Sequence, residues 1–168
     1  RFLAYAKRMK NRASAVFIYD VAQRRSVQVT DGITHAQTPV FDKNGKYLYF
    51  LSSANAGTTE FNWGVLNGVL ANPLIVRRVH AVVLANDSAS PLLPNGQPNP
   101  DAKVGEVAPA VKIDFEGLRS RVVNLPMPQR DYSQLVAGQP GKLVVNYREW
   151  SGDPGGPWNS VVSSFDVA

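Results

Sequence analysis

Short apolar stretches, rich in β-branched and aromatic residues and separated by polar turns, run through most of the chain. This pattern is typical of β-strands and not of helices, whose apolar positions recur every three or four residues. It predicts strands over residues 2–6, 15–21, 26–30, 38–41, 46–52, 79–85, 111–115, 121–125, 132–136, 142–147 and 160–167. The first three form a meander of antiparallel strands.

The clearest hairpin joins residues 38–41 to 46–52 through the turn Asp42-Lys43-Asn44-Gly45. Asn44 and Gly45 are the residues that most readily adopt the positive backbone φ of such a turn. Asp42, Asn44 and Gly45 also resemble the opening of a calcium loop, but the later ligands and the closing Glu are absent. The sequence therefore predicts a structural turn here and no metal site.

Two long insertions interrupt the strand pattern. Residues 54–78 contain several glycines together with large apolar side chains, so we expect an ordered excursion that packs on the rest of the protein. Residues 86–109 contain five prolines and are expected to be exposed and mobile.

A short repeat indicates how the strands are organised. Tyr19-Asp20-Val21-Ala22 recurs as Phe165-Asp166-Val167-Ala168, and Ile113-Asp114-Phe115-Glu116 is a looser copy followed by Gly117. A carboxylate at the end of a strand can accept hydrogen bonds from turn N–H groups. We therefore interpret Asp20, Asp114, Gly117 and Asp166 as structural turn residues and not as paired acid–base groups.

The repeat and the strand spacing predict an all-β protein built as a partial β-propeller. Blades of four antiparallel strands take about 40–45 residues each, and a ring needs about 4–8 of them. The chain then holds about three blades or part-blades: the end of one at 1–32, one with both insertions at 33–126, and the start of another at 127–168. Because an open arc leaves strand edges and blade faces uncovered, we expect a fragment of a larger protein or self-association.

Composition narrows the functional classes. Of the 168 residues, 44% are hydrophobic and 18% are charged, which is typical of globular domains. The chain contains no cysteine, which excludes disulfides, thiolate metal sites and a cysteine nucleophile. No apolar run reaches the roughly 18–20 residues that a membrane-spanning helix needs. Arg1 begins directly in strand-like sequence, without an initiator Met or a signal peptide, which suggests a mature or excised segment.

The net charge of +5 raises the question of nucleic acid. A nucleic-acid platform would interleave aromatic and basic residues, whereas the early aromatics fall at alternating strand positions typical of a core. We therefore interpret the basic residues as a solvated face and expect neither nucleic acid nor a membrane as a partner.

Candidate chemistry is sparse. His35 and His80 are the two histidines, and neither has metal-ligand spacing or a Gly-x-Ser-x-Gly neighbour, so structural or surface roles are favoured. No catalytic residue, metal or cofactor is expected. Arg77 and Arg78 precede a strand and are candidates for a substrate channel, where the pair would bind peptide carboxylates, although a solvated basic pair is the alternative.

The stretch from Pro39 to Ser53 resembles the propeller repeat shared by TolB-like proteins and tricorn-type serine peptidases. A more specific combination follows: residues 81–87, then Ser90-Pro91-Leu92, then residues 111–118, 121–126 and Tyr132. That order is similar to the second propeller of bacterial tricorn homologues, and the resemblance covers nearly all of the chain.

The resemblance implies a large, periplasmic or secreted enzyme in which propellers channel and filter peptides for a serine active site further along the chain. The partners would be the remaining blades, the peptidase domains and peptides. None of the family's catalytic positions maps onto this chain. A TolB-like interaction module with no peptidase attached is the rival hypothesis, and a small enzyme in its own right is a third.

Overall fold

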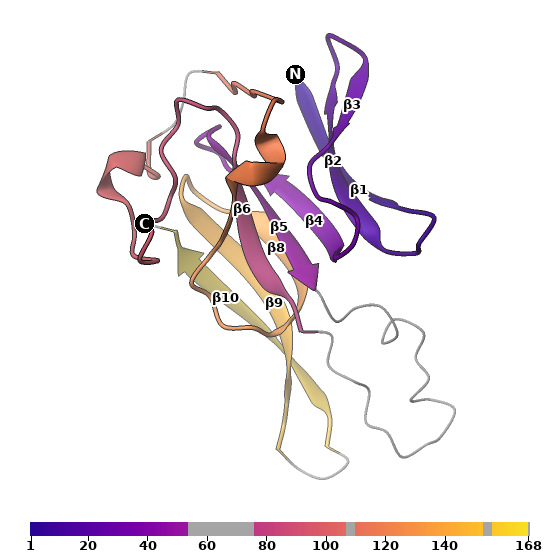
Figure 1. Ribbon diagram of the computed structural model, residues 1–168. Coiled ribbons are helices and arrows are strands. Elements are labelled where there is room, and N and C mark those ends of the chain that lie inside the picture. Colours follow the sequence, from indigo (N-terminus) through magenta and orange to yellow (C-terminus); the bar gives the residue numbers. More distant parts are fainter. Residues whose placement is uncertain (54–75, 107–109, 153–155, 168) are drawn as a thin grey trace.

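The structure, a computed structural model, describes residues 1–53, 76–106, 110–152 and 156–167. Within these ranges, ten strands and two 3-10 helices follow one another (Figure 1): β1 (Phe2–Arg8), β2 (Ser14–Asp20), β3 (Arg25–Gln28), β4 (His35–Phe41), β5 (Tyr47–Ser53), β6 (Arg78–Val83), η1 (Pro100–Ala102), η2 (Leu118–Arg121), β7 (Val122–Asn124), β8 (Asp131–Ala137), β9 (Lys142–Trp150) and β10 (Trp158–Asp166).

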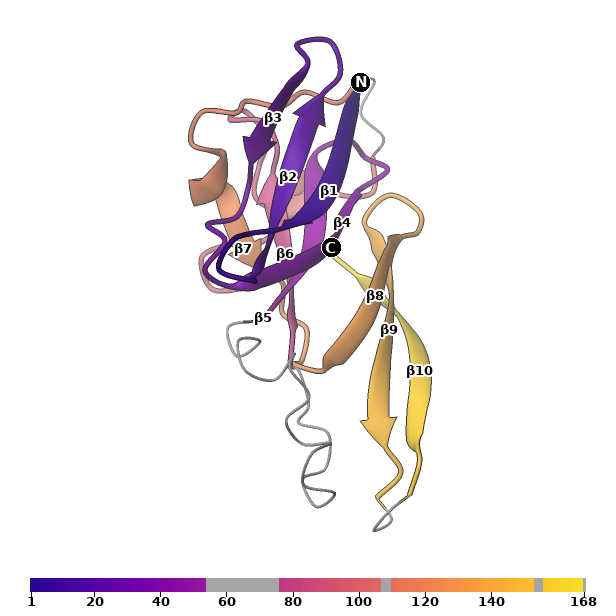
Figure 2. The same cartoon turned by 90° about the vertical axis from the view of Figure 1, so that its right-hand side faces the viewer.

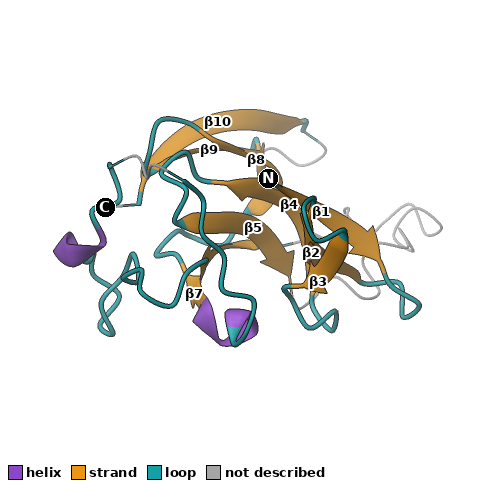
Figure 3. Ribbon diagram, turned by 90° about the horizontal axis from the view of Figure 1, so that it is seen from above, coloured by secondary structure: helices purple, strands orange, loops and turns teal. Residues whose placement is uncertain are grey.

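The strands form three antiparallel sheets, each a meander in chain order: β1-β2-β3, β4-β5-β6-β7 and β8-β9-β10. The first strands of the sheets lie next to one another, because β4 contacts β1 on one side and β8 on the other (Figure 2). Seen from above, the sheets stand side by side and do not close into one barrel (Figure 3). The predicted fold class, an all-β partial propeller, is confirmed. The blade boundaries stay a prediction, and one sheet lies within each predicted range.

The middle sheet is buried on both faces, which explains the continuous apolar run Tyr47–Leu51 in β5. Tyr47, Tyr49 and Leu51 point into a core shared with the third sheet. Leu48 and Phe50 point into a second core shared with the first sheet. Successive side chains of a strand face opposite sides, so one strand supplies both cores.

Residues 111–115 are not a strand, contrary to prediction. The segment is extended, and the Asp114 N–H donates to Leu84 O at 2.9 Å, but no ladder forms. Periodicity cannot distinguish a strand from an extended segment that packs on a sheet, as Ile113 and Phe115 do here. The following strand is also shorter than predicted, because η2 takes residues up to Arg121.

The insertion at 86–109 is only partly exposed. Leu92, Ala102 and Val104 are buried in the core between the second and third sheets, so the expectation of a wholly exposed segment is wrong for residues 86–106. Asn99 caps η1 by accepting from the Asp101 N–H at 3.1 Å. Most of the other insertion lies outside the described residues. No helix in the described parts is long and apolar enough to cross a membrane.

Candidate functional site

The three repeat aspartates occupy different environments. Asp20 ends β2, and its Oδ1 accepts from the N–H groups of Ala22 and Gln23, at 2.9 and 3.1 Å, which closes the turn to β3. Asp166 ends β10, and its carboxylate lies 3.1 Å from Lys142 Nζ across the sheet. Asp114 lies in the extended segment and not at a strand end, so the structure does not place the three residues in one common turn.

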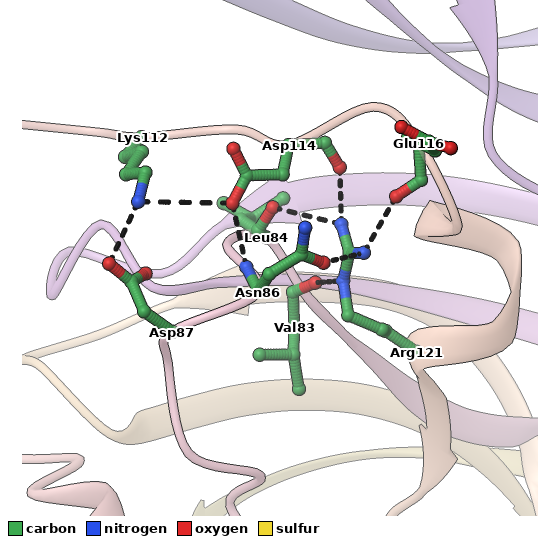
Figure 4. A network of polar contacts seen from close by, with 8 residues as sticks. All are labelled: Val83, Leu84, Asn86, Asp87, Lys112, Asp114, Glu116 and Arg121. Atoms are coloured by element: carbon green, nitrogen blue, oxygen red, sulfur yellow. Dashed lines mark hydrogen bonds and ion pairs between the residues drawn. The ribbon is translucent and has the colours of Figure 1, made fainter.

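Asp114 belongs to a polar network beside the end of β6 (Figure 4). Asp114 Oδ2 accepts from the Asn86 N–H at 2.8 Å and lies 3.9 Å from Lys112 Nζ. Gly117, with a φ of +65°, begins η2 in a left-handed conformation that glycine adopts without strain. This positioning brings Arg121, at the end of η2, into the network.

Sequence reasoning missed Arg121, which holds this network together. Its guanidinium donates to the main-chain oxygens of Val83, Leu84, Asp114 and Glu116 and to the side chain of Asn86 (Figure 4). Carbonyl oxygens that no ladder satisfies need such a donor. The arrangement fixes the end of β6. We interpret it as structural and not as a catalytic or binding site.

The turn containing Asn44 and Gly45 connects the second sheet to its surroundings. Gly45 has a φ of +73°, and its N–H donates to Asp42 O at 3.0 Å. The buried Asn44 side chain accepts from the Lys46 N–H and donates to Val104 O at 3.0 Å. The turn thus also anchors the chain that follows η1.

The carboxyl group of Asp42 is buried between the second and third sheets. It accepts from the Tyr49 hydroxyl at 3.0 Å and from the Gly141 N–H at 3.2 and 3.3 Å. Burial raises the pKa of Asp42 above its usual value, while the bonds from Tyr49 and Gly141 act in the opposite direction. The groups that donate to this carboxyl group thus belong to the protein itself. The described residues contain no cluster of His, Cys, Asp and Glu that could hold a metal.

Arg77 lies between the second and third sheets. It is buried, and its Nη1 donates to Asp131 Oδ1 at 3.0 Å and to Tyr132 O at 2.7 Å. Arg148 contacts the other carboxylate oxygen, with Nε 2.6 Å from Asp131 Oδ2. Arg77 therefore joins the second sheet to the third and is not solvated. A role for it in a substrate channel stays a prediction.

Arg78 points to the opposite face of β6 and is exposed. The amide oxygen of Gln129 accepts from its Nε and Nη2, at 2.6 and 3.1 Å. Both residues line a cavity of about 410 Å³, together with Thr34, Ser52, Ser53, Val76 and His80. Gln129 was not singled out from the sequence, because nothing local indicates that the linker between β7 and β8 returns to Arg78.

The two histidines have different surroundings. His35 is buried, and its ring accepts from the Ser14 N–H at 3.2 Å and bonds Gln37 at 3.1 Å, so it connects β4 to β2. His80 is half-buried, and its ring stacks on Phe50 with centroids 5.2 Å apart. Burial lowers the pKa of His80, and the positive charge of Arg78 lowers it further.

Comparison with known proteins finds similarity to tricorn protease homologues. A tricorn protease homologue of Streptomyces coelicolor is 34% identical over 126 residues, which is 70% of this chain. A tricorn protease homologue of Saccharolobus solfataricus is 27% identical over 121 residues, 71% of this chain. The chain spans about a tenth of the length of each relative. No model of a known protein family matches.

The fold is also similar to that of a tricorn protease, over more of this chain than the sequence matches cover. The crystal structure of the tricorn protease superposes with a TM-score of 0.64 and 20% sequence identity. The match covers 99% of this chain and 16% of that structure's chain.

Proposed function

We propose that this chain, a propeller segment of the tricorn type, is a non-catalytic scaffold that gates peptides on their way to a serine active site elsewhere in its parent protein. The observation that carries the proposal is the side-by-side placement of β1, β4 and β8, the first strands of the three sheets (Figure 2). Propeller blades surround a central channel. Side chains on these inner strands would therefore line the path of a peptide.

The remaining blades are the partners that the outer faces of this arc would need. On the third sheet, Val136, Val144 and Val162 are 55%, 36% and 68% exposed. On the first sheet, Leu3 is 58% exposed beside the stacked rings of Tyr5 and Phe17. Large exposed apolar side chains that share one sheet face favour contact with another protein layer.

A matched pair of substitutions in the full-length parent tests the gating role. Ser133→Trp places a bulky side chain at an exposed position of the inner strand β8, and Ser163→Trp does the same on the outer strand β10. We expect Ser133→Trp to lower kcat/KM for long peptides by several-fold while hydrolysis of a dipeptide ester is retained. Ser163→Trp should leave both unchanged.

Equal effects of the two substitutions, or equal effects on long and short substrates, would refute gating. The purified 168-residue chain should hydrolyse neither peptides nor esters above background, which separates this proposal from an enzyme in its own right. A parent without peptidase activity would favour the rival TolB-like interaction module.

A further inference from the structure

The cavity beside Arg78 has the size and polarity of a site for a small charged group. Its volume of about 410 Å³ falls within the range of about 300–1,000 Å³ that ligand pockets take. Its lining comes from four separate parts of the chain: Thr34 before β4, Ser52 and Ser53 at the end of β5, Val76, Arg78 and His80 around the start of β6, and Gln129 before β8. The cavity therefore lies where the linkers between neighbouring sheets meet.

The two adjacent arginines differ in what balances their charge. The guanidinium of Arg77 lies 3.0 Å from the carboxylate of Asp131. Arg78 is held by a neutral amide, because Gln129 accepts from Nε and Nη2. None of the described residues that line the cavity is acidic. Among the described residues, the positive charge of Arg78 in the cavity thus has no negative counterpart.

The position of Gln129 determines which part of the Arg78 guanidinium can act. The amide oxygen occupies the side formed by Nε and Nη2, at 2.6 and 3.1 Å. The other end of the guanidinium, formed by Nη1 and the second hydrogen of Nη2, is left to bind a ligand. Its two parallel N–H groups match the two oxygens of a carboxylate. Gln129 also restricts the rotation of the side chain, which reduces the entropy lost on binding.

The other polar groups of the cavity can donate hydrogen bonds without adding charge at neutral pH. The hydroxyls of Ser52 and Thr34 lie 3.2 Å apart and bond each other. His80 stacks on Phe50, and its imidazole can present one N–H to the cavity when neutral. One cation among neutral donors matches the single charge of a carboxylate better than the nearly double charge of a phosphate.

We infer that Arg78, oriented by Gln129 and assisted by His80 and the hydroxyls of Ser52 and Thr34, forms a binding pocket for a carboxylate group. The source of the carboxylate is a peptide, at its C-terminus or on an acidic side chain, and only this last step rests on the proposed function.

Titration calorimetry on the purified 168-residue chain tests the pocket with four probes. These are acetyl-Ala-Ala-Ala with a free carboxylate, the same peptide amidated, acetyl-Ala-Asp-Ala amide, and inorganic phosphate. We expect the free carboxylate to bind and the amidated tripeptide to bind at least about tenfold more weakly, since a hydrogen-bonded charge is lost. The Asp-containing amide shows whether a side-chain carboxylate serves as well as a C-terminus.

Substitutions then assign the binding to Arg78. Arg78→Gln should weaken binding of the free carboxylate by about tenfold or more, and Arg78→Lys should restore part of it, because a lysine keeps the charge and loses the paired donors. Arg8→Gln, which removes an exposed arginine from β1, is the matched control and should bind as the unmodified chain does. Circular dichroism verifies that each variant is folded.

Three results would overturn the inference: equal binding of the free and amidated peptides, equal losses in Arg78→Gln and Arg8→Gln, or tighter binding of phosphate than of the free carboxylate. The test needs no peptidase activity. Its failure would therefore leave the gating proposal standing, and a failure of gating in the parent would leave the pocket assigned.

Discussion

The first and second sheets meet through apolar side chains and the bond from the Ser14 N–H to His35, whereas the second and third sheets share a buried ion pair and a buried carboxyl group. Val16 and Ile18 of β2 pack on Leu48 and Phe50 of β5 at the first junction. The second junction adds the Arg77–Asp131 ion pair and the Asp42 carboxyl. Apolar packing tolerates many geometries, but buried charges need specific partners. The sequence therefore specifies the packing of the third sheet on the second more narrowly than the packing of the first sheet on the second.

The largest expected effect comes from Asp131→Asn, which removes the carboxylate between Arg77 and Arg148. Loss of the carboxylate beside the buried Arg77 should lower the free energy of unfolding by about 3–5 kcal/mol, measured by urea denaturation. Asp166→Asn is the matched control, because it breaks an exposed pair with Lys142 and should change stability little. Equal effects of the two substitutions would show that the second junction does not depend on its buried charges.

Gly141→Ala should disturb the same junction by a steric route. Gly141 has a φ of +75°, and an added Cβ would meet Val104 Cγ1 at 2.7 Å. We expect a loss of about 2–4 kcal/mol in the free energy of unfolding, from backbone strain and overpacking together. Gly96→Ala is the matched control: Gly96 has a φ of +81°, so the backbone strain is shared, but an added Cβ would meet no atom within 4 Å. A loss in Gly141→Ala no larger than in Gly96→Ala would contradict the close approach.

The second junction should also respond to pH through Asp42. The folded pKa lies above the usual value of 3.8, so the folded state holds this proton more tightly than the unfolded state does. The free energy of unfolding of the unmodified chain, relative to Asp42→Asn, should therefore fall as the pH rises from 3.8 through the folded pKa. Tyr49→Phe removes a bond that lowers the pKa and should move this fall to higher pH. Parallel stability curves for the chain and Asp42→Asn would contradict the assignment.

The smallest effect belongs to the cavity beside Arg78. In Arg78→Gln, the pKa of His80 should rise but stay below 6.5, because burial is the larger cause of its depression and remains in the variant. NMR titration of the imidazole protons measures this, with His35→Gln used to assign the second resonance. An unchanged pKa would show that Arg78 does not act on His80.

Sequence reasoning predicted most of the strands and the all-β fold because each sheet is a meander of neighbours in the chain. The Asn44-Gly45 turn and the apolar run of β5 are local signals of this kind. The error at residues 111–115 arose because an extended apolar segment packed on a sheet resembles a strand in its pattern.

The candidate site was less predictable, because long-range contacts define it. Arg77 and Arg78 are adjacent in sequence, yet the alternation of a strand sends one to Asp131 and the other to Gln129. Asp131 did carry a signal, since an acidic residue beside a predicted core strand needs a partner when it is buried. No local signal distinguishes Gln129 or Arg121 from ordinary surface residues.

The structure of the full-length parent protein, determined by electron cryomicroscopy, tests the central claim most directly. The account predicts that the three sheets are consecutive sectors of one ring, with β1, β4 and β8 facing its axis and further blades covering Leu3 on one side and Val136, Val144 and Val162 on the other. A parent in which these outer faces are open to solvent, or in which β3 and β10 face the axis, would contradict it.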